Sequence, residues 1–263
     1  MKRILTIAGS DSGGGAGIEA DIKTISALGA YACTAITAVT AQNTLGVAGV
    51  HTLPADFVRL SIETVLSDIG ADAIKLGMLA NEDIIRAVAA SLPPDIPVVL
   101  DPVMVATSGA VLLPDAAIAA LKAELLPRAT VVTPNLPEAA KLTGLPIGNE
   151  AERIEAGRAL LAMGAKAALV KGGHGEGDML TDYLVTPEGV EAISLPRLPG
   201  KNTHGTGCTM AAAIATGLAQ DLPLIDATRR ARHYLQEAIR TAPGFGQGHG
   251  PVNHLVHTSK IRV

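Results

Sequence analysis

Short apolar runs with the character of β-strands alternate with helical patterns along nearly the whole chain. The first unit is a run at residues 3–8, followed by a glycine-rich segment and a helical pattern over residues 17–28. Four later apolar runs are expected to be strands, at residues 73–76, 97–100, 130–133 and 166–171. Apolar strands separated by helices indicate an α/β fold, with a mostly parallel sheet covered on both faces. Ligands in such folds bind at the carboxyl ends of the strands.

The rest of the pattern extends this architecture. Residues 31–40 are rich in Thr, Val and Ile and predict one strand, and residues 47–52 predict another. A hairpin is expected between strands at residues 178–185 and 190–195. Further helices are expected at residues 54–68, 81–91, 114–126, 137–142, 150–163, 206–219 and 224–241. No shift in composition marks a linker and no internal repeat is found, so residues 1–263 are expected to form a single domain.

Composition excludes several classes of function. The 263 residues are 48% hydrophobic and 17% charged, which is enough apolar side chain to bury a core. A net charge of −4 and an aromatic content of 2% argue against a nucleic-acid-binding surface. No stretch approaches the roughly 18 uninterrupted apolar residues of a membrane span, so we expect no membrane association. Cys33 and Cys208 cannot make a disulfide framework, and the apolar run at residues 4–8 is too short for a signal peptide. We therefore expect a cytoplasmic protein, with Cys33 as a small core residue.

A glycine-rich segment, residues 9–17, follows the first expected strand and opens a helix. Glycines let backbone N–H groups approach a ligand closely, and a helix N-terminus favours an anion. The segment matches neither the P-loop nor a clean dinucleotide-binding fingerprint. The alternative is that it is only a tight turn from strand to helix.

A second glycine-containing turn precedes the helix expected at residues 206–219. Gly205, Thr206 and Gly207 lead into Cys208, and free amides at such a helix start would bind an anion. The same helix start would favour the thiolate form of Cys208. The alternative is that Cys208 is a small buried residue at a tight helix start.

Oxygen and nitrogen side chains end several of the other strands. Asn135 and Glu138 lie three apart after the strand at 130–133, a spacing that suits Mg²⁺ through water but equally forms a helix cap. Asp101 ends another strand. It could organise a metal ion or water there, or it could form a turn before Pro102. Lys171 could hold a phosphate, or could face solvent. His204 lies beside the second glycine turn, where a lone histidine is more often structural.

Six motifs taken in order resemble the hydroxymethylpyrimidine/phosphomethylpyrimidine kinases of thiamine biosynthesis. They cover nearly the whole chain, at residues 6–21, 40–44, 75–79, 133–139, 171–174 and 201–209. The resemblance implies the ribokinase-like superfamily, a three-layer αβα domain without a P-loop, and a homodimer. It also implies phosphoryl transfer from ATP with Mg²⁺. The acceptors would be the hydroxymethyl group of 4-amino-5-hydroxymethyl-2-methylpyrimidine and then the phosphate of its monophosphate.

The resemblance assigns a substrate site residue by residue. Asp21 and Gln42 would hydrogen-bond the aminopyrimidine edge, and Gly9 would contribute its backbone. Met78 and Val103 would pack on the ring.

The resemblance also implies the phosphate-transfer residues. Lys171 and Cys208 would form the catalytic pair. Asn135 would contact the ATP phosphates and Glu138, with Asp101, would organise Mg²⁺. The anion hole would be supplied by Gly205, Thr206 and Gly207. Sugar-kinase relatives carry an aspartate as general base at the position of Cys208.

Three other activities are weighed against this expectation. Pyridoxal kinase belongs to the same superfamily and takes an acceptor that is also a small aromatic ring with a hydroxymethyl group. A sugar kinase is disfavoured by Cys208 and Gln42. A binding protein without catalysis is disfavoured by the presence together of Lys171, Asn135, Glu138 and Cys208, which binding alone does not need.

Overall fold

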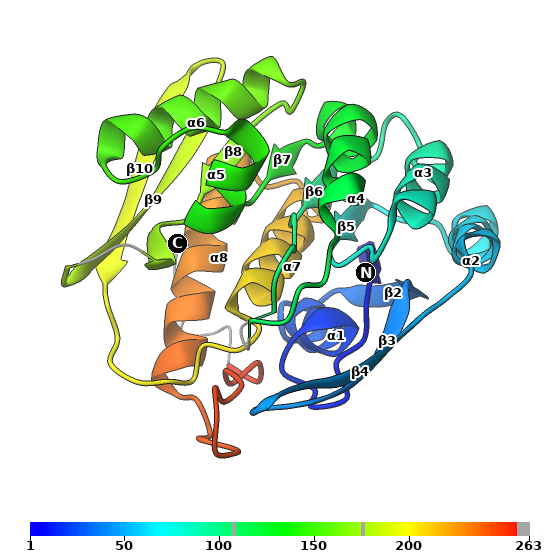
Figure 1. The fold of residues 1–263 in the computed structure, drawn as a ribbon, viewed down its shortest axis with the longest axis horizontal. Coiled ribbons are helices and arrows are strands. Elements are labelled where there is room, and N and C mark those ends of the chain that lie inside the picture. Colours follow the sequence, from blue (N-terminus) through cyan, green and yellow to red (C-terminus); the bar gives the residue numbers. More distant parts are fainter. Residues whose placement is uncertain (107–108, 175–176, 257–263) are drawn as a thin grey trace.

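A computed structural model describes residues 1–106, 109–174 and 177–256, and its main feature is an eight-stranded sheet (Figure 1). The strand order is β10-β9-β8-β7-β6-β5-β1-β2. Six strands run parallel: β1 (Arg3–Ala8), β2 (Tyr31–Ile36), β5 (Ala73–Leu76), β6 (Val98–Leu100), β7 (Val131–Val132) and β8 (Ala168–Val170). The last two, β9 (Met179–Thr186) and β10 (Gly189–Pro196), form the expected hairpin and run antiparallel.

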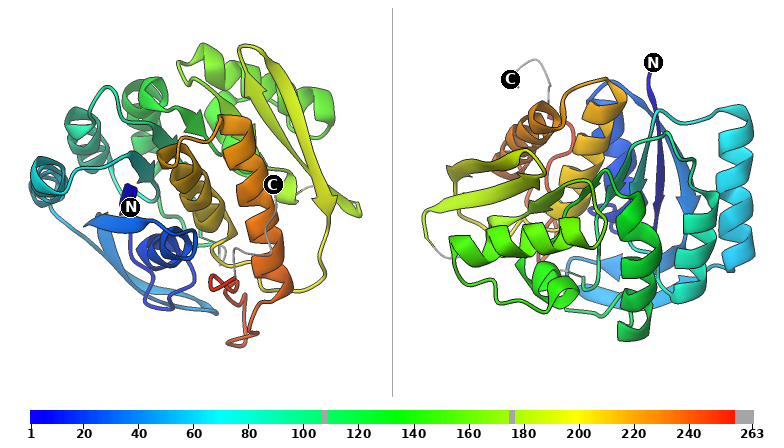
Figure 2. Two further views of the ribbon diagram at one scale, coloured as in Figure 1. Left: turned by 180° about the vertical axis from the view of Figure 1, so that it is seen from behind. Right: turned by 90° about the horizontal axis from the view of Figure 1, so that it is seen from above.

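Helices cover both faces of this sheet, as the views in Figure 2 show. One face packs against the helices α2 (Ala55–Asp68), α3 (Glu82–Ser91), α4 (Asp115–Ala120), α5 (Leu136–Thr143) and α6 (Glu150–Ala162). The other face packs against α1 (Gly17–Ala27), α7 (Thr206–Ala219) and α8 (Leu224–Arg240). Neighbouring residues of β1 show why both faces are covered, because Leu5 and Ile7 enter the first core and Ile4 enters the second. The expected three-layer αβα arrangement is confirmed.

Residues 31–40 form two strands, not one as predicted. β2 pairs with β1 only up to the partners Ala8 and Ile36, where β1 ends. The buried Thr37 then anchors a turn in the chain, donating its N–H to the carbonyl of Ala8 and its hydroxyl to the carbonyl of Met78. The continuation, β3 (Ala38–Asn43), pairs instead with β4 (Gly46–Thr52) as a separate antiparallel hairpin. Propensity along one segment does not reveal where its neighbouring strand stops.

The helix expected at residues 114–126 is also interrupted. After α4 the chain widens into a π-helical turn, Leu121–Leu125, and tightens into a 3₁₀ turn, Leu126–Arg128. Pro127 accounts for the change, since it has no N–H to continue the helical hydrogen bonds. Within the described part of the chain, no helix combines the length and the apolar character needed to cross a membrane.

Candidate active site

Lys171 and Asp101 meet at the carboxyl edge of the sheet. Asp101 follows β6 and Lys171 follows β8, and Nζ of Lys171 lies 3.0 Å from Oδ1 of Asp101. Thr133, which follows β7 between them, donates its hydroxyl to the same oxygen over 3.1 Å. Burial acts to lower the pKa of Lys171, but the carboxylates of Asp101 and Glu138 outweigh burial and raise it. Lys171 is therefore a fixed positive charge, and a freely solvated lysine is excluded.

The N-terminus of α7 faces this ion pair. A methyl group at Gly207 would lie 3.2 Å from Nζ of Lys171 and 3.3 Å from Oδ2 of Asp101, so the first turn of the helix approaches the pair with no side chain between. Gly205 begins the helix at φ +80°, and a side chain there would collide with the carbonyl of Gly15. Gly205 is therefore required both for its conformation and for space, whereas Gly207 leaves open the space in front of the ion pair. The first amides of the helix have no acceptors within it, and they point toward the edge of the sheet where Lys171 lies; the amide of Thr206 also donates to the carbonyl of Thr203 over 3.4 Å.

Cys208 lies in this first turn, but its environment does not favour a thiolate as expected. Burial raises the pKa of the Cys208 thiol to about 11. The positive charge of Lys75 lowers this pKa, and the carboxylates of Asp21 and Asp101 raise it further. A hydrogen bond with the backbone of Gly17 also lowers it. Desolvation therefore outweighs the attraction of the helix start, and Cys208 is a neutral thiol at pH 7.

Asp21 is buried beside Lys75, and its expected hydrogen bond to the aminopyrimidine stays a prediction. It has no exposed surface, and its Oδ2 accepts hydrogen bonds from Lys75, at 2.8 Å, and from Thr6. Lys75 is equally buried, and the space for its ammonium is kept by Gly77, where a methyl group would lie 2.8 Å from Nζ. The sequence does carry a signal for this pair, which the family motifs alone do not reveal: a lysine inside the otherwise apolar strand Ala73–Leu76 must find a buried partner.

Asn135 and Glu138 cap α5, and the capping alternative accounts for every bond recorded between them. The side chain of Asn135 accepts from the Glu138 amide over 2.9 Å, and the Glu138 carboxylate accepts from the Asn135 amide over 2.8 Å. Glu138 is nevertheless more than a surface cap. Burial raises its pKa to about 7, with Lys171 opposing and Asp101 adding to that shift. The capping glutamate thus belongs electrostatically to the Lys171–Asp101 pair.

The glycine-rich loop after β1 is closed by its own aspartate. The Asp11 carboxylate accepts hydrogen bonds of 2.8–2.9 Å from the amides of Gly13, Gly15 and Ala16. These amides are therefore not available to a ligand anion, and for this part of the loop the tight-turn interpretation is correct. His204 lies against the same carboxylate at 2.7 Å, buried, which fits the structural role expected of a lone histidine.

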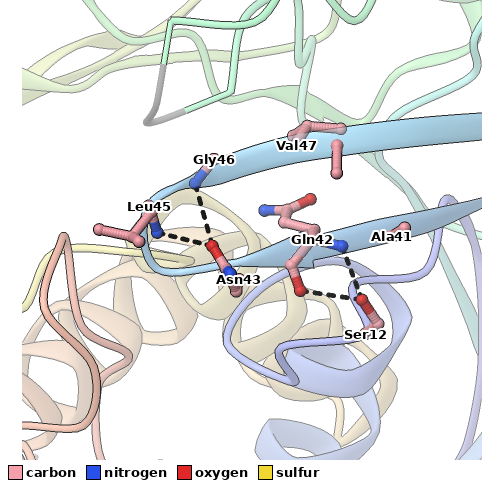
Figure 3. Close-up of a pocket in the computed structure, with 8 residues that line it drawn as sticks. Ser12, Ala41, Gln42, Asn43, Leu45, Gly46 and Val47 are labelled. Carbon is pink, nitrogen blue, oxygen red and sulfur yellow. Dashed lines mark hydrogen bonds between the residues drawn. The ribbon is translucent and has the colours of Figure 1, made fainter.

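A groove of about 540 Å³ lies along the β3–β4 hairpin (Figure 3). Gln42 contributes to it and is tied to the glycine-rich loop, because Ser12 both donates to its carbonyl (2.9 Å) and accepts from its N–H (2.7 Å). The described lining consists of Ser12, Ala41, Gln42, Asn43, Leu45, Gly46, Val47 and Ala48.

Two more of the expected ring-binding residues are in contact next to β1 and β5. A methyl group at Gly9 would lie 2.9 Å from Sδ of Met78, so the glycine makes room for the methionine. Val103 lies on the segment after β6, half-buried against the first core. Gly9, Met78 and Val103 therefore follow three adjacent parallel strands, at the edge where Asp101 also lies.

The chain matches a known protein family over most of its length. The family model for phosphomethylpyrimidine kinase matches residues 11–253. The hydroxymethylpyrimidine/phosphomethylpyrimidine kinase of Escherichia coli is 49% identical over 97% of this chain and 98% of its own length. The corresponding protein of Bacillus subtilis is 47% identical over 97% of the chain and 95% of its own length. The chain also matches 53% of the length of a thiamine biosynthesis bifunctional protein from Geobacter sulfurreducens, at 49% identity.

Solved structures show the same fold. A phosphomethylpyrimidine kinase from Clostridium difficile superposes with a TM-score of 0.81 at 39% identity, covering 91% of this chain and all of that one. A pyridoxal kinase from Staphylococcus aureus, in complex with ADP, superposes with a TM-score of 0.91 at 34% identity, covering 99% of this chain and 96% of that one. Sequence and fold lead to one assignment over nearly the full length: the chain belongs to the phosphomethylpyrimidine kinase family.

Proposed function

We propose that this chain transfers the terminal phosphoryl group of ATP to 4-amino-5-hydroxymethyl-2-methylpyrimidine, and then a second one to the resulting monophosphate. The observation that carries the proposal is that the start of α7 faces Lys171 and Asp101 at the strand ends, so that helix amides and an ammonium group for the phosphates lie beside a carboxylate for the metal ion. Relatives named for both kinase steps, at 47–49% identity over nearly the whole chain, support the choice of acceptor.

ATP would bind between α7 and the ends of β7 and β8. Lys171 and the amides of Gly205, Thr206 and Gly207 would hold its phosphates, with Asn135 beside them. Support comes from the pyridoxal kinase of Staphylococcus aureus, which shares this fold and was solved with ADP and with AMP-PCP bound.

The charged groups here fit Mg²⁺. Asp101 and Glu138 offer two carboxylates that lie close to Lys171, and no group of three or more candidate metal ligands occurs among the described residues. Mg²⁺ commonly keeps several waters and uses one or two carboxylates with substrate phosphates. We propose that Asp101 and Glu138 fill this role; the ion would neutralise charge on the phosphates.

The chemistry then depends mostly on positioning and electrostatics. Lys171 and the α7 amides would stabilise negative charge on the phosphoryl oxygens as the bond to the leaving group breaks. Cys208, in the same turn, would receive the proton of the hydroxymethyl group in the first reaction through its thiolate, which is the minor form at pH 7. The second acceptor is a phosphate that is already ionised, so that reaction has no alcohol proton to remove.

Measuring ADP formation tests the proposal directly. The pyrimidine alcohol and its monophosphate would be supplied separately, with Mg²⁺ and ATP, and we expect both to be phosphorylated. ADP formation that does not depend on either acceptor would refute the proposal and indicate an ATPase, and the absence of ADP with both acceptors would refute it and favour a binding protein.

Pyridoxal kinase activity is the second candidate. The pyridoxal kinases of Bacillus subtilis and Staphylococcus aureus superpose with TM-scores of 0.88–0.91 at 34% identity. Because the named pyrimidine kinases are closer in sequence, we expect kcat/KM for the pyrimidine alcohol to exceed that for pyridoxal in parallel assays. The reverse order would reassign the substrate.

A further inference from the structure

His204 connects three segments that are distant in the sequence. Its buried imidazole places Nε2 2.7 Å from Oδ2 of Asp11, in the glycine-rich loop. The same nitrogen lies 3.3 Å from the side-chain amide of Gln42, on β3. The backbone N–H of His204 donates to the carbonyl of Gly250, in the segment that follows α8. The histidine therefore contacts Gln42, which the family resemblance expects to bind the substrate, although no such role is expected of His204 itself.

Asp11 determines where His204 carries its proton. Burial acts to raise the pKa of Asp11, but the contact with His204 and the amides of Gly13 and Ala16 outweigh it, so the pKa lies below its ordinary value. An ionised carboxylate has acceptors only. A contact of 2.7 Å between such a carboxylate and Nε2 requires a hydrogen on that nitrogen. His204 is therefore a donor at Nε2.

That hydrogen limits how Gln42 can face the imidazole. In the structure Nε2 of Gln42 faces His204, which sets two donors against each other. Its Oε1 lies 3.4 Å from Oγ1 of Thr40, whose hydrogen already goes to the carbonyl of Ser10 over 3.0 Å. A half-turn of the amide exchanges two atoms of nearly equal size and removes both oppositions. The oxygen of Gln42 then faces the Nε2–H of His204 as the longer arm of a three-centre hydrogen bond whose shorter arm goes to Asp11, and the nitrogen donates to Thr40.

We infer that His204, held by Asp11, is a positioning residue that fixes the amide of Gln42 with its oxygen toward the imidazole and thereby sets the direction in which the substrate ring binds. This inference rests on the proposed function. The edge of a 4-aminopyrimidine presents one acceptor, the ring nitrogen, beside one donor, the amino group. A fixed amide pairs with that edge in one order only, and the order decides on which side the neighbouring 5-hydroxymethyl group lies. Discrimination by such paired polar contacts is strong because the wrong order opposes donor to donor.

The first test compares two substitutions of His204. His204→Ala removes the donor, and we expect KM for the pyrimidine alcohol to rise about 5- to 10-fold while KM for ATP changes less than about twofold. His204→Gln places an amide N–H near the position of Nε2 and should recover most of that loss. An equal rise in both variants, or an equal effect on the KM for ATP, would show that the histidine only fills space and would overturn the inference.

The second test is a double-mutant cycle with Gln42. If His204 acts through Gln42, His204→Ala should change KM for the pyrimidine less than about twofold in a Gln42→Ala background. Independent effects that multiply would overturn the inference. If Gln42→Ala alone leaves KM unchanged, the proposed substrate site fails; if it raises KM and His204→Ala does not, only the present inference fails.

His254 provides a matched control. Like His204 it is a buried histidine, but it lies in the segment after α8, where its Nε2 is 3.1 Å from the hydroxyl of Thr209. His254→Ala should lower the melting temperature with no selective rise in KM for the pyrimidine. A selective rise as large as that of His204→Ala would count against the inference.

A measurement on the unsubstituted protein does not depend on the folding of any variant. In ¹⁵N-labelled protein, the His204 signals, assigned by their loss in His204→Gln or by sequential connectivity, should show a proton on Nε2. A bare Nε2 would make the imidazole an acceptor toward Gln42 and would overturn the inferred orientation.

Discussion

The role of Cys208 can be tested by comparing the two phosphoryl transfers, because only the first acceptor has an alcohol proton to lose. Cys208→Ala removes the proposed proton acceptor, so we expect phosphorylation of the alcohol to fall by about 10²-fold or more. Phosphorylation of the monophosphate should fall much less, and KM for ATP should stay nearly constant. Steady-state kinetics with each acceptor would measure this. Near-normal turnover of the alcohol would assign Cys208 to packing.

The raised pKa of Cys208 predicts a pH dependence. Because the pKa is raised to about 11, the thiolate fraction below that pH increases with each unit of pH. The rate of alcohol phosphorylation should therefore rise as pH increases from 7 to 9, by up to about tenfold per unit if thiolate formation limits the rate. The monophosphate reaction should show a shallower profile. A flat profile for the alcohol in the unsubstituted chain would contradict a role for the thiolate.

The buried pair of Asp21 and Lys75 predicts a loss of stability. Lys75→Met removes the only cation that contacts the buried Asp21 in the described structure and leaves its carboxylate with the hydroxyl of Thr6, which costs about 3–5 kcal/mol in the free energy of unfolding. Adding Asp21→Asn should recover part of the loss, since no charge then remains. Urea unfolding of the single and double variants measures both changes. A single variant as stable as the parent would show that water or a counter-ion reaches Asp21.

At the scale of single residues, the chemical type of a site residue was easier to predict than its surroundings. The sequence indicated Lys171 and Asp101 at strand ends, and the structure brings them to 3.0 Å. It could not show that Asp21 is buried, because burial depends on which strands and helices cover the residue. The thiol pKa of Cys208 was misjudged for the same reason.

The start of α7 is the element on which the phosphate site depends. Gly207→Ala would place a methyl group 3.2 Å from Nζ of Lys171, in the space proposed for a phosphate. We expect kcat to fall by about 10²-fold, as when one oxyanion contact is lost. Alanine is also the better helix former, by up to about 1 kcal/mol, so the melting temperature should not fall. We expect lower activity together with unchanged or higher stability. Full activity would show that the start of α7 does not contribute to the phosphate site.

Among the elements, those with strong local signals were predicted well. The boundaries of α7, Thr206–Ala219, agree with the sequence pattern, and Asn81 caps α3 by accepting from the amide of Ile84. The break at Thr37 and the π-helical turn at Leu121–Leu125 were missed. The break at Thr37 follows from contacts with other segments, and the π-helical turn follows from the geometry of one proline. Neither feature changes the hydrophobic pattern of the sequence.

At the scale of the whole molecule, association of two chains stays a prediction of the family resemblance. Light scattering on purified protein should give twice the mass of one chain at micromolar concentration. The mass of a single chain across the accessible concentration range would contradict it.

The sequence by itself determined the α/β class, the order of most elements and the family, because these depend on local periodicity and on residue types at strand ends. Only the tertiary structure decided which side chains meet. It buried Asp21 against Lys75, closed the glycine loop on Asp11, and set His204 between that loop and Gln42. The physical reason is that burial, charge and hydrogen-bond partnership depend on distant segments, such as those of Asp11 and His204, 193 residues apart, whose approach no local pattern records.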